Sequence, residues 1–280
     1  MFQIVSKKML NNTVCEMDVL APMVAKKARA GQFIILRVDE GGERIPLTVA
    51  GCDENEGLVK IIFQIVGSTT EKLNQKNVGD SISDFVGPLG NPTEIENVKN
   101  ACVVGGGVGC AIAMPVARAL KNSGANVTSV IGFRSKDIVI LEDEFKEISN
   151  NFYLTTDDGT YGEQGNVCVP LERLLASGTK FDKIYAIGPL IMMKFVVATA
   201  KKYNIPCIVS MNPIMIDGTG MCGCCRLSVN GKMKFACVDG PDFDGYGVDF
   251  DEAMWRNNMY KEFEAKKREE TCNLFKKEVR

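Results

Sequence analysis

The stretch ACVVGGGVG (residues 101–109) decides the fold of the middle of this chain, because an apolar strand runs directly into a glycine-rich turn. The residues that follow, 110–122, are small and compatible with a helix. A strand, a tight turn and a helix start place backbone N–H groups around an anion with no Cβ in the way, which suits the pyrophosphate of a dinucleotide. An ordinary connection between a strand and a helix has the same pattern, so this motif leaves both interpretations open.

Downstream of that turn, apolar segments alternate with helix-compatible ones. The further strands are predicted at 127–133, 151–155, 181–187 and 207–210, with a helix at 190–203. Strands that alternate with helices indicate a parallel α/β sheet. The second strand ends in GFRSK, and the cations Arg134 and Lys136 there favour the 2′-phosphate of NADP, unless they are simply solvated.

Upstream, the first hundred residues are typical of short strands rich in Val, Ile and Phe. These are predicted at 2–8, 13–19, 33–38, 47–52 and 58–66, separated by glycine and polar turns. Their close spacing leaves no room for crossover helices, so we expect an antiparallel barrel or sandwich. In GDSISDFVGPLGNP (residues 79–92), Gly87, Pro88, Gly90 and Pro92 are expected to break any regular element.

A cysteine-rich loop, DGTGMCGCC (residues 217–225), follows the α/β region. Plant-type [2Fe–2S] ferredoxins space their ligands Cys-x₄-Cys-x₂-Cys with a distant fourth. Asp217, Cys222 and Cys225 have this spacing, Cys237 is the distant member, and we expect these four to hold a [2Fe–2S] cluster. Cys224 is the alternative to Asp217 as fourth ligand. A zinc site built from the four cysteines, or a set of buried thiols, are the competing interpretations.

The composition limits the chemistry. The 280 residues suggest about two domains, and 33 basic against 35 acidic residues give a net charge of −2, which argues against nucleic acid as a partner. Histidine is absent, which excludes Ser-His and Cys-His nucleophile pairs, so cofactors must carry most of the chemistry. Eleven cysteines without an apolar export signal or membrane span predict a soluble, cytoplasmic protein with no membrane partner, whose clustered thiols bind metal.

Taken in order, these motifs resemble the ferredoxin-reductase superfamily, and within it the electron-transfer subunits with a C-terminal [2Fe–2S] cluster. That branch includes subunits of dihydroorotate dehydrogenase and the small subunits of NADH-dependent reduced ferredoxin:NADP⁺ oxidoreductases. The second group is the more similar, because the dihydroorotate subunits normally have cysteine where Asp217 stands. The motifs are RIPLT (44–48), VGSTT (66–70), GPLGNP (87–92), GGGVG (105–109), GFRSKD (132–137), LEDEF (141–145), TTDDGTYGEQG (155–165), AIGPLIMMKFV (186–196), the cluster loop and VDGPDFDG (238–245).

The resemblance implies a division of the chain into four parts. They are a six-stranded antiparallel FAD-binding barrel (1–97), a parallel-sheet NAD-binding domain (98–211), a cluster-binding region (212–250) and a helical tail (251–280). Ile45 occupies a place where this superfamily often has a second arginine. The residues implied at FAD are Arg44, Pro46, Leu47 and Thr48 along the flavin, with Thr48 as the catalytic residue, and Val66, Gly67, Thr69 and Thr70 on the ribityl chain and pyrophosphate.

The nicotinamide nucleotide implied by the resemblance is NAD(H), with Arg134 on the adenosine side, against the preference for NADP that Arg134 and Lys136 indicate by themselves. The implied nucleotide residues are Gly107, Val108, Gly109, Arg134, Asp157, Asp158, Gly159, Gly188, Pro189 and Met192.

The resemblance also implies a function. Hydride would pass between NAD(H) and FAD, and single electrons would pass through the cluster to a larger flavin and [4Fe–4S] subunit that binds NADP(H) and ferredoxin. An electron-transfer subunit of dihydroorotate dehydrogenase or a similar flavin dehydrogenase is the alternative, and a structural zinc protein is the interpretation from another class. The stretch 251–280 is either a docking element or a solvated terminal helix.

Overall fold

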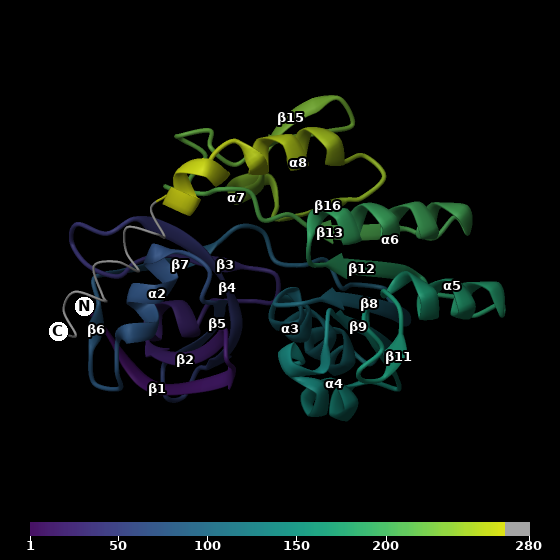
Figure 1. The fold of residues 1–280 in the computed structure, drawn as a ribbon, viewed down its shortest axis with the longest axis horizontal. Helices are drawn as coiled ribbons and strands as arrows, with labels where there is room; N and C mark the ends of the chain where they lie inside the picture. The colour runs from purple at the N-terminus through teal and green to yellow at the C-terminus, as the bar shows by residue number, and fades with distance from the viewer. Residues whose placement is uncertain (267–280) are drawn as a thin grey trace.

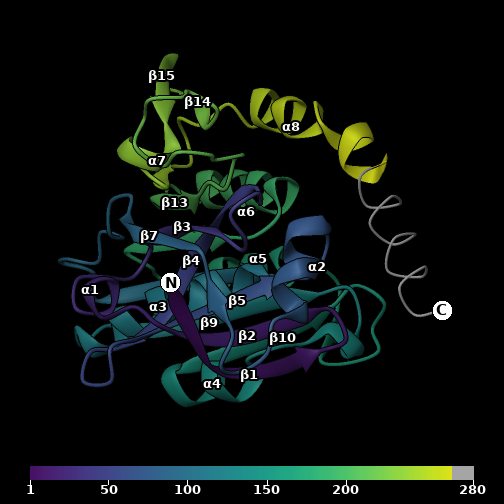
Figure 2. The same cartoon turned by 90° about the vertical axis from the view of Figure 1, so that its left-hand side faces the viewer.

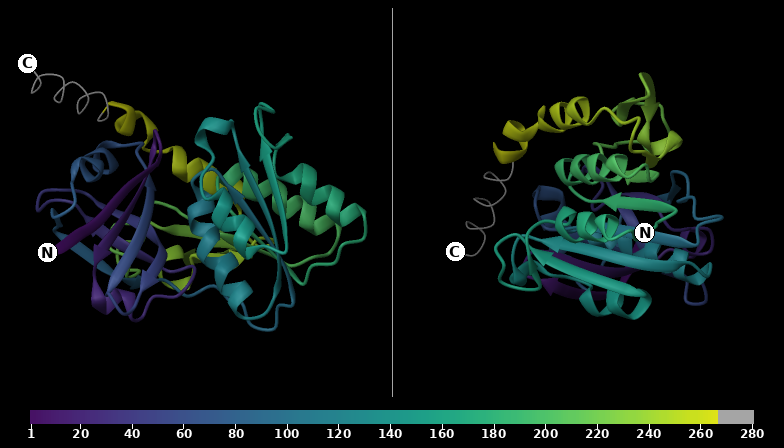
Figure 3. Two further views of the ribbon diagram at one scale, coloured as in Figure 1. Left: turned by 90° about the horizontal axis from the view of Figure 1, so that it is seen from below. Right: turned by 90° about the vertical axis from the view of Figure 1, so that its right-hand side faces the viewer.

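A computed structural model of the chain describes residues 1–266 and contains two large sheets and a small third region. In Figure 1 the first sheet lies at one end of the molecule and the second at the other, while the third region lies above both. Figure 3 shows the two sheets side by side from below. In residues 1–266, none of the helices combines the length and the hydrophobicity that a membrane span requires.

The first sheet is an antiparallel barrel. Its strands are β1 (Phe2–Asn11), β2 (Val14–Leu20), β3 (Phe33–Arg37), β4 (Arg44–Asp53), β5 (Leu58–Gln64), β6 (Ser81–Ile82) and β7 (Asp84–Leu89), with helices α1 (Pro22–Ala25) and α2 (Ser68–Gln75). The order is β6-β1-β2-β5-β4-β3-β7, and only Ser83 separates β6 from β7. One continuous stretch therefore pairs with β1 at its start and with β3 at its end, which closes six strands into a barrel, as predicted.

The prediction that Gly87 and Pro88 break any regular element was wrong, since both lie in β7. The register between β3 and β7 shifts here, because Phe33 pairs with Leu89 but Ile35 pairs with Val86. A shifted register tolerates a proline, which has no N–H for the ladder. Gly87 is required by close packing, since a Cβ there would lie 2.5 Å from Ile34 Cγ2.

The second sheet is parallel, as predicted, apart from one strand at its edge. It contains β8 (Asn100–Gly106), β9 (Asn126–Phe133), β10 (Asn151–Thr156), β11 (Glu163–Gln164), β12 (Lys183–Ile187), β13 (Cys207–Ser210) and the antiparallel β16 (Asp242–Asp244). The order is β11-β10-β9-β8-β12-β13-β16, so the direction of winding reverses between β8 and β12. Ligands of open α/β sheets bind at the carboxyl ends of the strands beside such a switch point.

Helices cover both faces of this sheet (Figure 3). They are α3 (Gly109–Asn122), α4 (Glu142–Ile148), α5 (Cys168–Ala176) and α6 (Leu190–Lys202), with a short 3₁₀ turn at Lys136–Ile138. Two separate clusters of buried side chains result, one that includes Leu120 under α3 and one that includes Val196 under α6. A sheet buried on both faces accounts for the apolar run at 101–104 and for the burial of residues 127–131, which include Thr128 and Ser129.

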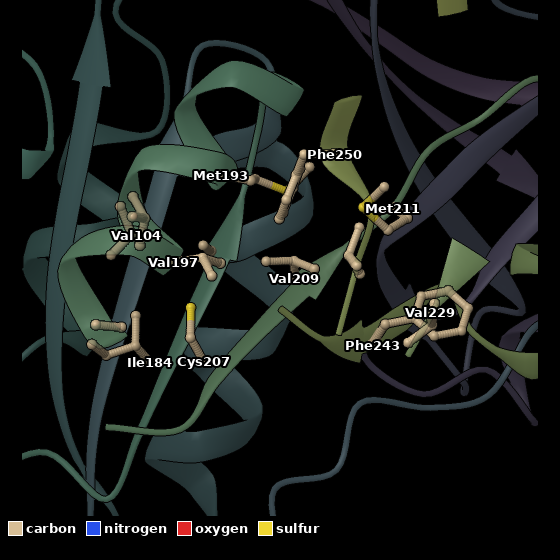
Figure 4. Close-up of a cluster of buried hydrophobic side chains, with 14 of the residues drawn as sticks. Val104, Ile184, Met193, Val197, Cys207, Val209, Met211, Val229, Phe243 and Phe250 are labelled. Carbon is tan, nitrogen blue, oxygen red and sulfur yellow. The ribbon is translucent and has the colours of Figure 1, made fainter. Parts of the chain in front are cut away.

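The third region packs on the second sheet through a shared core. It contains α7 (Ala236–Asp239), the hairpin β14 (Arg226–Val229) and β15 (Lys232–Phe235), and α8 (Phe250–Asn258). Val209 of β13, Phe243 of β16 and Phe250 of α8 belong to one cluster of buried side chains. Figure 4 shows these side chains beside Val197 of α6, between the sheet and the third region. Burial of this shared surface holds the cysteine-rich loop against the sheet.

A short segment, residues 89–94, connects the barrel to the third region. Asn91 donates from its backbone N to the Gly240 carbonyl over 2.6 Å. Thr93 donates from Oγ1 to Asp242 Oδ2 over 2.6 Å. The other carboxylate oxygen of Asp242 is sealed from solvent and has no hydrogen-bond partner among residues 1–266. Burial therefore raises the pKa of Asp242 above its ordinary value of 3.8.

Because its folded-state pKa is raised, the Asp242 carboxyl favours the folded protein when protonated and loses that contribution as pH rises above about 4. Asp242→Asn is expected to remove this dependence, since asparagine still offers an oxygen to Thr93 and carries no charge. Melting temperatures measured between pH 4 and 8 should fall for the wild type relative to the variant as pH rises. Parallel curves for the two proteins would contradict the assignment.

Candidate electron-transfer site

A large cavity of about 1430 Å³ lies between the barrel and the third region, beside α8. Ordinary small-molecule sites have volumes of about 300–1,000 Å³, so this cavity has room for a large ligand. Predicted flavin residues form its barrel side. Those that line it are Arg44, Pro46, Val66, Gly67, Thr69 and Thr70.

The β4 side of the cavity is formed by the start of the strand, where the consecutive residues Arg44, Ile45 and Pro46 all line it. Thr48 is half-buried, pairs with Phe33 of β3 and lies outside the cavity lining. Leu47 is also outside the lining. The roles of Thr48 and Leu47 at a flavin therefore remain predictions.

Helix α2, which the sequence analysis missed, contributes its N-terminus to the cavity. Thr70 Oγ1 accepts hydrogen bonds from the backbone N–H groups of Val66 and Gly67, each over 3.1 Å. The first N–H groups of a helix and its dipole suit the phosphate groups of a nucleotide. The pattern Ser68-x-x-Glu71 is typical of a helix start and is the signal that predicts this helix.

The charges beside this helix are arranged in pairs. Asp84 Oδ2 lies 2.7 Å from Arg37 Nε and 3.6 Å from Arg44 Nη2. Glu43 Oε2 accepts from Thr69 Oγ1 over 2.9 Å. One carboxylate, that of Asp84, therefore orients two guanidinium groups at the cavity wall, and Glu43 adds a second negative charge beside them.

The predicted nucleotide residues lie along the carboxyl edge of the second sheet. Gly107 donates from its backbone N to the Gly132 carbonyl over 2.9 Å, with a φ of 54°. Asp158 donates from its backbone N to the Arg134 carbonyl over 3.2 Å. The loops after β8, β9 and β10 are thereby connected, with Asp157 and Gly159 on either side of Asp158.

The loop before α6 completes this edge across the switch point. A Cβ on Gly109 would lie 2.6 Å from Gly188 Cα, so the start of α3 is in close contact with the loop of Gly188 and Pro189, which leads into α6 and its residue Met192. These residues lie outside the cavity lining, as do Gly107 and Arg134, but Leu190 lines the cavity. The first residue of α6 therefore lies between the predicted nucleotide edge and the cavity.

The predicted cluster ligands form two pairs in the third region. Asp217 Oδ2 accepts from the backbone N of Cys222 over 2.6 Å, and its Oδ1 accepts from Thr219 Oγ1 over 2.8 Å. Cys225 Sγ lies 3.2 Å from Cys237 Sγ. Two pairs of donors suit a centre with two iron atoms, each bound by two protein ligands.

Ionisation differs between the two pairs. Hydrogen bonds from the Cys222 thiol and the Thr219 N–H hold the pKa of Asp217 well below its usual range, so this carboxylate is charged at neutral pH. Burial raises the pKa of Cys237 to about 12, so its thiolate needs a bound cation to form near neutral pH. Three thiols and an ionised carboxylate fit an iron–sulfur cluster.

The alternatives to that ligand set are also placed by the structure. Cys224 lines the cavity beside Arg226, on the loop between Cys222 and Cys225. In residues 1–266, no three His, Cys, Asp or Glu side chains are arranged to hold a single metal ion. The cysteine-rich loop thus places Cys224 at the cavity, whereas Met221, which is 87% exposed, lies at the outer surface.

The tight contact at the nucleotide edge makes a prediction. Gly109→Ala places a Cβ 2.6 Å from Gly188 Cα and 2.7 Å from the Ile187 carbonyl, both backbone atoms. We expect a destabilisation of roughly 1–3 kcal/mol and weaker binding of NADH, measured by thermal unfolding and by titration. Gly41→Ala, with no atom within 4 Å of its Cβ, is the control. A Gly109→Ala variant that melts and binds like the Gly41→Ala protein would contradict the packing argument.

Comparisons with known proteins agree with this arrangement. Residues 212–249 match the family described as the iron–sulfur cluster binding domain of dihydroorotate dehydrogenase B. The electron transfer subunit homolog of dihydroorotate dehydrogenase B (NAD(+)) from Thermotoga maritima is 51% identical over 262 residues, which cover 94% of this chain and 92% of that protein. The corresponding subunit of Geobacillus thermodenitrificans is 34% identical over 86% of this chain and 94% of that protein.

Solved structures show the same fold. A chain of the NADH-dependent reduced ferredoxin-NADP oxidoreductase is similar with a TM-score of 0.90 and 48% identity, covering 96% of both chains. Phthalate dioxygenase reductase, at 18% identity, has a TM-score of 0.56 over 72% of this chain and 64% of that one, which supports the fold alone. The chain belongs to the family of dihydroorotate dehydrogenase B-type electron-transfer subunits, which are oxidoreductase subunits with the ferredoxin-reductase fold and an iron–sulfur cluster domain.

Proposed function

We propose that this chain exchanges hydride between NAD(H) and FAD, and single electrons through a [2Fe–2S] cluster with a larger subunit that binds NADP(H) and ferredoxin. The observation that carries the proposal is the cavity, whose wall includes both the predicted flavin residues of the barrel and Cys224 of the cluster loop. FAD, when bound, accepts two electrons together as hydride and releases them one at a time, which an iron–sulfur cluster requires.

In this proposal the barrel (1–97) binds FAD. Arg44 and Pro46 lie along the flavin, together with Leu47 and Thr48, and Thr48 hydrogen-bonds a ring heteroatom. The N-terminus of α2, with Val66, Gly67, Thr69 and Thr70, binds the diphosphate through the first N–H groups of the helix and its dipole. This assignment is supported by the lining of the cavity, which includes the start of β4 and the start of α2.

The second sheet (98–211) binds NAD(H) in the same proposal. The turn of Gly107, Val108 and Gly109 lies at the switch point, where a pyrophosphate meets the start of α3. The names of the relatives support NAD(H) over NADP(H) at this site, since they specify NAD(+) or NADH. Arg134, Asp157, Asp158 and Gly159 would surround the adenosine, and Gly188, Pro189 and Met192 the nicotinamide half.

The cluster region (212–250) binds the [2Fe–2S] centre through Asp217, Cys222, Cys225 and Cys237. The carboxylate is already ionised, and the two buried thiols lie within contact of each other. Cys222 and Met221 are exposed on the outer side of this loop. A partner that docks there would exclude water from the cluster and approach it closely.

The larger partner subunit is inferred from the names of the relatives, which describe electron transfer subunits. A flavin and [4Fe–4S] partner that binds NADP(H) and ferredoxin is supported by the 48% identity to a chain of the reduced ferredoxin-NADP oxidoreductase. A dihydroorotate dehydrogenase partner is the second candidate, supported by the name of the 51% identical relative.

Anaerobic purification of the full chain with its native partner tests the function. We expect one FAD in this subunit, about two iron atoms with acid-labile sulfide in its cluster, and reduction of both by NADH. Activity of the complex with ferredoxin and NADP⁺ supports the first partner, and dihydroorotate-dependent NAD⁺ reduction supports the second. A colourless preparation without iron or flavin would overturn the proposal.

The choice between Asp217 and Cys224 as ligand can be tested separately. Asp217→Ala is expected to lose the oxygen donor and with it most of the bound iron, whereas Cys224→Ala should retain about two iron atoms. Asp217→Cys, which restores a donor as thiolate, should keep the cluster with an altered spectrum of the reduced state. Iron analysis measures the retention of the cluster, and EPR of the reduced proteins measures the change in its spectrum. An unchanged spectrum in Asp217→Ala would assign the fourth ligand to Cys224.

A further inference from the structure

Helix α8 and the turn after it form one wall of the large cavity. Ala253, Arg256, Tyr260 and Phe263 all line the cavity; the first two belong to α8, Tyr260 lies in the turn after it and Phe263 follows that turn. Residues 261–266 are again helical after the turn at 259–260. In Figure 2 this segment extends from the hairpin β14–β15 over the side of the molecule where α2 lies. The wall therefore faces the helix N-terminus proposed to bind a diphosphate.

Arg256 supplies an unpaired positive charge to this wall. Its side chain is half-buried, and no carboxylate oxygen of residues 1–266 lies within 4 Å of it. Arg37 and Arg44, on the opposite wall, share Asp84. The side chains of the cavity lining are basic in excess, with Arg37, Arg44, Arg226, Arg256, Lys261 and Lys266 against Glu43 and Glu264. A half-buried guanidinium without a carboxylate is suited to a bound phosphate anion.

Aromatic surface lies next to that charge. Tyr260 is 52% exposed and Phe263 is 73% exposed, although both line the cavity. Large aromatic side chains left open at a cavity are ready to cover a flat ring system. Trp255 of α8 is also exposed but lies outside the cavity lining. Exposed aromatic side chains of this segment are therefore found both at the cavity and away from it.

We propose that Arg256 of α8, with Tyr260 and Phe263 of the turn and helical residues that follow α8, forms a wall of the FAD site, with Arg256 on the diphosphate and the aromatic side chains against the rings. A dinucleotide combines two negative phosphates with two flat ring systems, and this wall presents one cation beside two open aromatic rings. The inference rests on the proposed function, because it requires FAD in the barrel. The wall lies outside the matched cluster domain, which ends at residue 249.

Titration of the full-length, FAD-depleted protein with FAD tests the wall. Arg256→Gln and Tyr260→Ala are each expected to raise the dissociation constant roughly tenfold, the change that corresponds to about 1.4 kcal/mol. Tyr260→Phe should restore most of the affinity, because it keeps the ring. The controls are Trp255→Ala on the outer side of α8 and Lys232→Gln on the exposed hairpin, and both should bind FAD like the wild type.

Hydrogen exchange of residues 253–264 provides a second measurement that does not depend on activity. FAD should slow exchange there in the wild type and not in Arg256→Gln. Equal affinities in all variants, or an equal loss in Trp255→Ala, would overturn the role of the wall while the proposed function stands. Protection by the partner subunit but not by FAD would also overturn it. A wild type that binds no FAD would instead overturn the proposed function itself.

Discussion

The attachment of the cluster region to both sheets is the constraint on which this structure depends. A flavin in the barrel and a nucleotide at the parallel sheet can exchange electrons with a cluster only if three separate parts of the chain meet at one place. Strand β16 extends the parallel sheet, Phe243 joins its core, and the contacts of Asn91 and Thr93 with Gly240 and Asp242 fasten the barrel to the same region. The packing of these three parts thereby brings the proposed cofactor sites close to one another.

A protein without histidine carries out this chemistry by binding and orienting. In the proposed function, the N-terminus of α2, the start of α3 and the guanidinium of Arg44 would provide N–H groups and positive charge for phosphates, and none of them would need to transfer a proton. In the cluster region, local contacts set the pKa values of two predicted ligands. Hydrogen bonds lower the pKa of Asp217 and keep it ionised, while burial raises the pKa of Cys237 and keeps it protonated until a metal binds.

Failures of prediction occurred where local sequence and tertiary context disagree. Pro88 was expected to end a strand, but β7 accommodates it at a register shift. Helix α2 was missed because its start was interpreted only as a set of phosphate-binding groups, although Ser68-x-x-Glu71 indicates a helix. That the tail, residues 251–280, is a docking element or a solvated helix stays a prediction. In the described part, to residue 266, several of its residues line the cavity, and residues 267–280 lie outside the described structure.

The amino-acid sequence alone determined the barrel, the parallel sheet and the spacing of Asp217, Cys222, Cys225 and Cys237, because strand periodicity, glycine turns and ligand spacing are local properties of the chain. Tertiary structure alone decided that the four predicted ligands form two pairs, that Cys224 lines the cavity, and that Arg256 approaches the same cavity as Arg44 and Gly67, about 200 positions earlier. Such contacts depend on how separately folded layers pack, which no local pattern encodes.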